Sequence, residues 1–267
     1  MAVTLDGFAL VLGASSGIGA ATARALARAG MDIVGVHLDR RSTQPLADAV
    51  RADIEAAGRT AWFFNVNAAD DAKRRAVLAD VAARLAERGK GEGVRVLMHS
   101  LAFGSLRPLV GGEGDETLTR AQIEMTLDVM ATSLVYWTQD LLAMGSLRPH
   151  GRVFAMTSGG STQALPSYGA VGAAKAALES YVRQLAVEGA ARGFTANAVC
   201  AGVTRTPALE RIPGHEQLIE RALAKHPQGR LTTPEDVARC IVALATPETD
   251  WMNGNVVRVD GGEGAAG

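Results

Sequence analysis

The chain has 267 residues, of which 48% are hydrophobic, and a formal net charge of −1. A chain of this length can bury the core of one large α/β domain, and its near-neutral charge gives no reason to expect nucleic acid or an anionic membrane as a partner. It has no apolar run near the ~20 residues of a membrane helix and no visible export signal, so we expect a cytoplasmic protein. The two cysteines and five histidines lack the paired spacing of metal ligands, so no metal site is predicted.

Short apolar runs alternate along the chain with alanine-rich runs of helical periodicity. Seven runs have the composition of strands: 8–12, 32–38, 60–64, 94–100, 152–158, 194–200 and 255–259. Helical periodicity covers the ranges 20–30, 44–58, 72–89, 120–144, 171–193 and 234–246. Parallel strands that are covered on both faces read as near-continuous hydrophobic runs. The pattern therefore predicts a doubly wound, seven-stranded parallel sheet in a single domain that spans 1–267.

Two insertions follow predicted strands. One is glycine-rich and lies near 104–118, and the other is polar and lies near 203–230. In doubly wound sheets, ligands bind outside the carboxyl ends of the strands, where both insertions emerge. We therefore expect both insertions to face the substrate.

The sequence GASSGIG comes directly after the first predicted strand and opens a helical run. Its glycines, Gly13, Gly17 and Gly19, permit a tight turn, a close approach of the backbone to a phosphate, and close packing of the helix on the strand. The amino terminus of the helix offers unpaired N–H groups and the positive end of its dipole to a pyrophosphate. Because a strand precedes this spacing and a helix follows it, the turn predicts dinucleotide binding.

These features resemble the short-chain dehydrogenase/reductase family from end to end. LGASSGIG matches the family's glycine motif, NVNAAD at 65–70 stands where the family's adenine-contacting Asp-Val stretch lies, and VDGG at 259–262 closes the last strand as in the family. The resemblance implies a Rossmann-type domain that binds a nicotinamide dinucleotide. The cofactor-binding residues that it implies are Gly13, Ser15, Ser16, Gly17, Ile18, Gly19, His37, Arg40, Asn65, Val66, Ser100, Ala102, Lys175, Gly202, Val203 and Thr206.

Tyr168 and Lys175 are seven residues apart in a helical run. Family members that reduce carbonyls pair a tyrosine with a lysine four residues on, and Val171 stands at that place here. Both spacings keep the pair on one helix face, and three extra residues move the anchor of the tyrosine ~4.5 Å along the axis. A more distant donor fits hydride attack on the β-carbon of an enoyl thioester, because the charge then develops on an oxygen three bonds away.

The Tyr-x6-Lys pair resembles the enoyl-acyl carrier protein reductases of the family. HSLAFG at 99–104 and NAVCAGVTRT at 197–206 are similar to their segments, and Met130 takes the place of an asparagine in the proton relay of the carbonyl reductases. The resemblance implies reduction of a trans-2-enoyl thioester, carried by acyl carrier protein or coenzyme A, in fatty acid biosynthesis. It assigns Tyr168 to the substrate oxygen, and Lys175 to the nicotinamide ribose.

Ser158 departs from that pattern, because it occupies the catalytic serine position of the carbonyl reductases. We include Ser158 with Tyr168 and Lys175 as candidate catalytic residues, and reduction of a 3-ketoacyl thioester or another carbonyl stays open. A third interpretation is a nucleotide-binding regulator without catalysis. The presence of the tyrosine, the lysine and the glycine turn argues against it.

The residues after the second strand bear on the choice between NADH and NADPH. A carboxylate about 20 residues beyond the glycine turn normally binds the adenosine ribose of NAD, and this count reaches Asp39. Alignment with the family from Gly30 instead puts His37 at the acid position, at the end of the strand. With Arg40 and Arg41 available to a 2′-phosphate, we expect NADPH to be preferred over NADH.

The long helical run at 120–144 bears on quaternary structure. The family pairs its long central helices across subunits, and this run contains more large apolar residues than a solvated face carries. We interpret Trp137 and its neighbours as a contact between subunits. We therefore expect a homotetramer, with a dimer as the alternative.

Overall fold

The computed structural model describes residues 3–89, 91–112, 114 and 116–266. Within these residues, one parallel sheet has the strand order β3-β2-β1-β4-β5-β6-β7. Its strands are β1 (Phe8–Leu12), β2 (Asp32–His37), β3 (Ala61–Asn65), β4 (Val94–His99), β5 (Leu147–Ser158), β6 (Phe194–Ala201) and β7 (Val256–Val259). The predicted doubly wound sheet is confirmed. The strand order reverses between β1 and β4, which is where ligands bind in such sheets.

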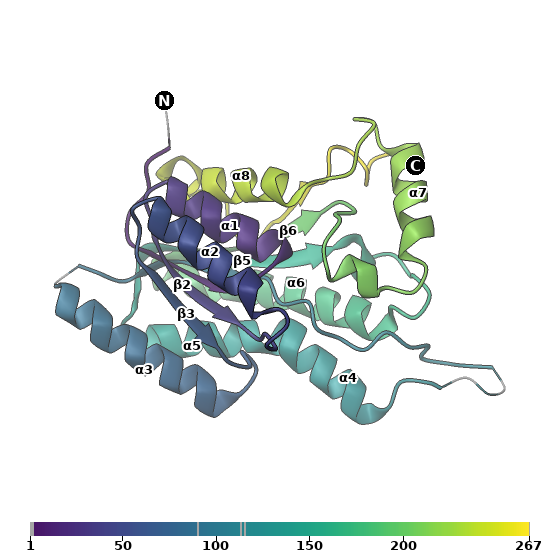
Figure 1. The fold of residues 1–267 in the computed structure, drawn as a ribbon, viewed down its shortest axis with the longest axis horizontal. Helices are drawn as coiled ribbons and strands as arrows, with labels where there is room; N and C mark the ends of the chain where they lie inside the picture. Colours follow the sequence, from purple (N-terminus) through teal and green to yellow (C-terminus); the bar gives the residue numbers. More distant parts are fainter. Residues whose placement is uncertain (1–2, 90, 113, 115, 267) are drawn as a thin grey trace.

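Helices cover both faces of the sheet (Figure 1). On one face lie α1 (Gly17–Arg28), α2 (Gln44–Ala56) and α8 (Pro234–Leu244), and on the other lie α3 (Asp71–Arg88), α4 (Arg120–Leu127), α5 (Ser133–Ala143) and α6 (Gly169–Ala190). Each face has its own apolar core, which explains why every residue of β1 is buried. In the part of the chain that the structure describes, we find no helix with the length and hydropathy to cross a membrane.

The helical run expected at 120–144 is interrupted by a π-helical turn at Asp128–Thr132, between α4 and α5. The hydroxyl of Ser133 donates to the carbonyl oxygen of Val129 at 2.9 Å. Such side-chain bonds compete with the regular helical ladder, and π turns are frequent at functional sites. This turn carries Met130, whose side chain lines the main pocket.

The polar insertion near 203–230 contains a helix that periodicity did not predict, α7 (His215–Lys225). The sequence signal for this helix is weak, because its apolar face is short: Ile219 and Ala222 are its buried residues. Gly214 precedes the helix with a φ of 76°, a left-handed conformation that glycine adopts without strain. The helix stands beside the carboxyl edge of the sheet (Figure 1).

The interpretation of Trp137 as a subunit contact is wrong. Its side chain is fully buried within the chain, in the core beneath α5, and its Nε1 donates to the carbonyl oxygen of Ala68 at 2.8 Å. A run of large apolar residues identifies a buried helix face, but it does not identify what buries that face. The neighbouring Tyr136 is 39% exposed, and its ring lies 5.3 Å from the guanidinium carbon of Arg74.

This difference predicts unequal effects of two adjacent substitutions. Trp137→Ala should lower the free energy of unfolding by about 3–5 kcal/mol, because it leaves a cavity in the core. Tyr136→Ala should cost less than about 1 kcal/mol, because it removes a half-exposed ring and one cation–π contact. Urea denaturation of both variants measures the two losses. Equal losses would contradict the placement of Trp137 in the core.

Candidate active site

A pocket of about 470 Å³ opens at the carboxyl ends of β4, β5 and β6. Ala102 follows β4, Ser158 ends β5 and Ala201 ends β6, and all three line the pocket. Both predicted insertions also contribute to its lining, with Gly104 from the first and Leu218 of α7 from the second. Because most of the lining is apolar, the pocket suits a largely apolar ligand.

Tyr168 is the N-cap residue of α6 and does not lie inside the helix. Its carbonyl oxygen nevertheless accepts the N–H of Gly172 at 2.7 Å, so the helical rise assumed for the tyrosine–lysine spacing starts at this residue. Ser167 before it has a φ of 58°, a strained conformation for a residue other than glycine. A Cβ on Gly160 would come 2.4 Å from the tyrosine ring, so glycine is needed there.

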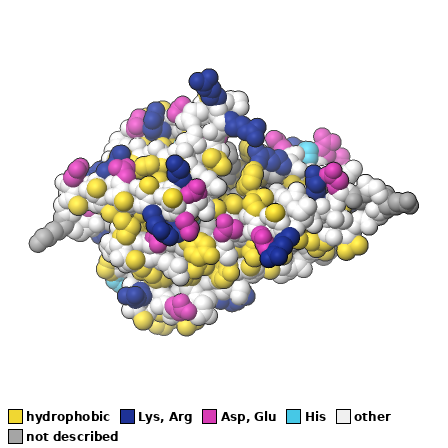
Figure 2. Space-filling model, turned by 90° about the horizontal axis from the view of Figure 1, so that it is seen from below, with side chains coloured by type: hydrophobic (Ala, Val, Ile, Leu, Met, Phe, Trp, Pro, Cys, Tyr) yellow, Lys and Arg dark blue, Asp and Glu magenta, His cyan; other side chains and the backbone are white. Residues whose placement is uncertain are grey.

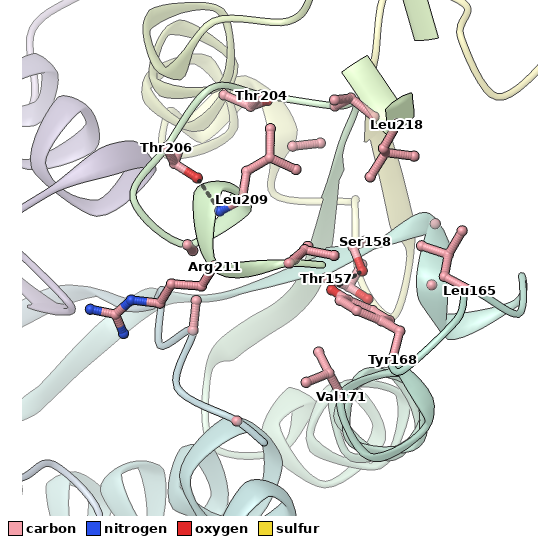
Figure 3. Close-up of a pocket in the computed structure, with 18 of the residues that line it drawn as sticks. Thr157, Ser158, Leu165, Tyr168, Val171, Thr204, Thr206, Leu209, Arg211 and Leu218 are labelled. Carbon is pink, nitrogen blue, oxygen red and sulfur yellow. Dashed lines mark hydrogen bonds between the residues drawn. The ribbon is translucent and has the colours of Figure 1, made fainter. Parts of the chain in front are cut away.

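The Tyr168 hydroxyl and the Ser158 hydroxyl face each other at the floor of the pocket (Figure 3). The distance between Oη and Oγ is 3.4 Å, which is long for a hydrogen bond between hydroxyls. Burial raises the pKa of Tyr168 above its ordinary value, and the contact with Ser158 opposes this only in part. The tyrosine is therefore protonated at neutral pH and can donate a hydrogen bond.

Lys175 lies buried beneath the pocket, and its Nζ donates to the carbonyl oxygen of Met156 at 2.7 Å. Burial lowers the pKa of Lys175 to about 8, while the carboxylate of Glu179 acts in the opposite direction. The lysine is therefore mostly charged at neutral pH.

Burial, together with the charge of Lys175, lowers the pKa of His99 to about 3, so the imidazole at the end of β4 is neutral. Its Nε2 lies 2.9 Å from the hydroxyl of Ser133.

Val171 fills the place where carbonyl reductases of the family have their tyrosine. Its side chain is 4% exposed and lines the pocket. A Cβ on Gly104 would come 2.8 Å from the Cγ2 of Val171 and 3.0 Å from the Sδ of Met130, so these groups are packed together. Among the described residues one turn before Lys175, the site therefore presents the aliphatic side chain of Val171.

The glycine turn has the geometry that its sequence predicted. Gly13 has a φ of 87° and Gly17 a φ of 54°, and a Cβ on Gly19 would come 2.0 Å from the carbonyl oxygen of Gly13. Ser16 is the N-cap of α1, but its side chain makes no capping bond, and the first turn contains no acid. The N–H groups of this turn thus lack a side-chain acceptor, and they fit the pyrophosphate of a dinucleotide.

A second group of predicted residues lies at the ends of β2 and β3. The Nδ1 of His37 lies 2.8 Å from a carboxylate oxygen of Asp39. Burial raises the pKa of Asp39, but hydrogen bonds from Thr43, Ser15 and His37 outweigh it and lower the pKa overall. A carboxylate that stays ionised at neutral pH therefore lies next to Ser15 of the glycine turn.

Asn65 holds the loop that carries Asp39. Its Oδ1 accepts the N–H of Asp39, and its Nδ2 donates to the carbonyl oxygen of Asp39, both at 2.9 Å. The N–H of Val66 donates to the carbonyl oxygen of His37 at 2.8 Å, which ties β3 to β2. The side chain of Arg40 is exposed on the same loop.

The structure thus brings the predicted residues together in two places. The pocket is lined by Ile18, Ala102, Ser158, Tyr168, Gly202, Val203 and Thr206. The carbonyl oxygen of Ser100 lies 2.4 Å from where a Cβ on Gly13 would be, beside the glycine turn. The residues at the ends of β2 and β3 form a separate group, joined to that turn through Ser15.

Two charged residues in the pocket were missed. Arg211 and Glu263 both line it, and the N–H of Val203 donates to the Oε2 of Glu263 at 2.9 Å. No motif contains Glu263, and its partner lies far away in the chain, so no sequence signal could have found this contact.

A family model described as Enoyl-(Acyl carrier protein) reductase matches residues 13–263. The short-chain reductase protein NovJ of Streptomyces niveus is 30% identical over 98% of this chain and 95% of its own length. The 3-oxoacyl-[acyl-carrier-protein] reductase of Synechocystis sp. is 33% identical over 95% of each chain. The crystal structure of enoyl-[acyl-carrier-protein] reductase (NADH) from Aquifex aeolicus VF5 has a TM-score of 0.83 and 26% identity, covering 100% of this chain and 99% of that one. The chain therefore belongs to the short-chain dehydrogenase/reductases, in the family that this enoyl-(acyl carrier protein) reductase model describes, and is an NAD(P)H-dependent oxidoreductase.

Proposed function

We propose that this oxidoreductase reduces the carbon–carbon double bond of a trans-2-enoyl thioester. The observation that carries the proposal is the packing of Val171 against Met130, one turn before Lys175. A carbonyl oxygen under hydride attack would need its proton donor near this place, where Val171 and Met130 present aliphatic and thioether groups. The hydroxyl of Tyr168, anchored three residues earlier, suits an oxygen further from the attacked carbon.

The cofactor, when bound, supplies a hydride to the β-carbon of the substrate. As the π electrons of the double bond move toward the thioester, the Tyr168 hydroxyl donates to the oxygen on which charge develops. A proton added at the α-carbon then completes the saturated thioester. Lys175 holds the nicotinamide ribose and keeps a positive charge beneath the site, while the apolar lining excludes water from the acyl chain.

One observation favours a second candidate, reduction of a carbonyl. Ser158 stands beside Tyr168, with 3.4 Å between their hydroxyl oxygens, and both line the pocket. The two hydroxyls could together bind a ketone oxygen, as the serine and tyrosine of carbonyl reductases do. The relative from Synechocystis, named as a 3-oxoacyl reductase, gives this candidate a precedent in the family.

Substitution of the two hydroxyl residues separates these candidates. On crotonyl thioester, Tyr168→Phe should lower turnover about 10²–10³-fold, the effect of removing one donor from a developing oxyanion. Ser158→Ala should lower it less, because Ser158 does not transfer the proton in this mechanism. Tyr181→Phe, a half-buried tyrosine further along α6, serves as the matched control and should leave turnover unchanged.

The same enzymes are assayed on acetoacetyl thioester. The enoyl proposal would be wrong if the wild type reduced the ketone much faster than the enoyl thioester and Ser158→Ala lowered turnover more than Tyr168→Phe. Turnover of neither substrate, with intact cofactor binding, would support the regulator without catalysis.

Lys175 predicts a pH dependence of cofactor binding. Its pKa of about 8 means that the ammonium is lost as the pH rises through this value. If the charge holds the cofactor, affinity should fall by roughly tenfold or more between pH 7 and pH 9.5. Lys175→Met should bind weakly at both pH values, without this fall, and should therefore lose activity. Titration by nicotinamide fluorescence measures the cofactor affinities of the wild type and of Lys175→Met at pH 7 and at pH 9.5. Equal affinities of variant and wild type would leave Lys175 without a role in binding.

Asp39 bears on the choice of cofactor. Its carboxylate lies beside the glycine turn, and its pKa is lowered, with Ser15 among the causes, so it is ionised at neutral pH. A carboxylate beside this turn suits the ribose hydroxyls of NAD and repels a 2′-phosphate. On this ground we propose NADH as the preferred cofactor. The NADPH preference expected from Arg40 and Arg41 becomes the alternative that the same measurement tests.

The wild type should use NADH with a kcat/KM about tenfold above that for NADPH, since like charges in contact are strongly unfavourable. Asp39→Asn should raise kcat/KM for NADPH and so bring it closer to that for NADH, because the substitution removes the charge while keeping hydrogen-bonding atoms. Higher efficiency with NADPH in the wild type, reduced by Arg40→Ala, would restore the preference inferred from the arginines.

The substrate carrier and the assembly also belong to this proposal. We propose an acyl thioester of acyl carrier protein or coenzyme A as the partner, a role in fatty acid biosynthesis in the cytoplasm, and a homotetramer. Figure 2, seen from the side of α3, α4 and α5, shows apolar side chains interspersed with charged ones. Ile123 on α4, Tyr136 on α5 and Met144 directly after α5 are 38%, 39% and 41% exposed. These residues, rather than Trp137, are the apolar groups that a partner subunit could cover.

A further inference from the structure

The carboxyl-terminal segment places an acid in the pocket. Among the described residues that line it, Glu263 is the only acidic one. Its Oε2 accepts the N–H of Val203 at 2.9 Å. A Cβ on Gly202 would come 2.7 Å from the same oxygen, so the carboxylate reaches this backbone only because residue 202 is glycine.

The turn that presents Glu263 is held from both sides. The two carboxylate oxygens of Asp260 accept the N–H groups of Gly262 and Gly264, at 3.0 and 3.1 Å. The N–H of Glu263 itself donates to the carbonyl oxygen of Asp260 at 2.9 Å. Gly261 and Gly262 have φ values of 57° and 91°, which other residues rarely adopt. The carboxylate is thus carried by an ordered turn, and not by a free end of the chain.

A backbone N–H beside a carboxylate has the chemistry that a primary carboxamide requires. The carboxamide oxygen accepts one hydrogen bond, and its NH₂ group donates two. The N–H of Val203 can serve the oxygen, while Glu263 can accept from the nitrogen in a charge-assisted bond. The pocket therefore holds both halves of a recognition site for the carboxamide of nicotinamide.

We propose that Glu263 is a cofactor-binding residue that accepts an N–H of the nicotinamide carboxamide, exchanging its bond to Val203 for this one. The inference rests on the proposal that this chain binds a nicotinamide cofactor, with Val203 among its cofactor-binding residues and the carboxamide at the Val203 backbone. Glu263 would fix which face of the nicotinamide ring is turned toward the substrate. The alternative is that Glu263 acts as a plug: its carboxylate occupies the Val203 N–H in the free protein, competes with the cofactor, and must move away before the cofactor binds.

An analogue that lacks the amide nitrogen distinguishes these two roles. In 3-acetylpyridine adenine dinucleotide, a methyl group replaces the NH₂ group, so the oxygen remains but the donor is lost. Calorimetry gives the affinities of reduced NADH and of the reduced analogue for the wild type, Glu263→Ala and Glu263→Gln. Glu210→Ala, which removes an exposed acid from the neighbouring turn at Leu209–Arg211, is the matched control.

Glu263→Ala should weaken NADH binding about tenfold to a hundredfold, as expected for a lost bond to a charged group, and leave the affinity of the analogue unchanged. Glu263→Gln keeps an acceptor oxygen and should fall between the alanine variant and the wild type, and Glu210→Ala should change neither affinity. Tighter binding of both dinucleotides to Glu263→Ala would overturn the proposal in favour of a plug. Equal weakening of both, or no change, would also overturn it. Failure of the wild type to bind either dinucleotide would overturn the underlying cofactor site as well.

Discussion

The packing of Val171 against Gly104 and Met130 is the constraint on which the chemistry of this site depends. Lys175 is fixed by burial and by its bond to the carbonyl oxygen of Met156, and the position one turn before it is closed by an aliphatic side chain. The hydroxyl of Tyr168 can therefore enter the pocket only from the start of α6. In the proposed mechanism, this arrangement sets the distance between the hydride source and the proton donor, and with it the class of bond that is reduced.

Much of the fold could be predicted from the sequence, because burial on both faces leaves near-continuous hydrophobic strands. The strand at Phe8–Leu12 agrees with its predicted range. The π turn at Asp128–Thr132 was not predicted, because apolar periodicity does not distinguish a single π turn within a helical run. Trp137 was misplaced for a related reason: periodicity shows that a helix face is buried, but not whether its own chain or a partner buries it.

The site residues also fall into those that the sequence could predict and those that it could not. The glycine turn, Tyr168 and Lys175 lie in contiguous motifs, and their placement could be predicted because a strand or helix carries each motif. Asp39 lies near Ser15, and Glu263 accepts the N–H of Val203, each across loops. These contacts depend on how the loops are tied, by Asn65 in one case and by Asp260 in the other. In the sequence, Asp39 is reached only by counting from the glycine turn, which alignment of the strand end with His37 outweighed, and Glu263 lies in no motif.

The central claim is that hydride is delivered to a β-carbon and not to a carbonyl carbon. Cofactor deuterated at the transferable position, offered together with equal amounts of crotonyl and acetoacetyl thioesters, tests this directly. Nuclear magnetic resonance of the products locates the deuterium. The account predicts butyryl thioester labelled at its β-carbon as the main product. Label found mainly on the carbinol carbon of 3-hydroxybutyryl thioester would contradict it.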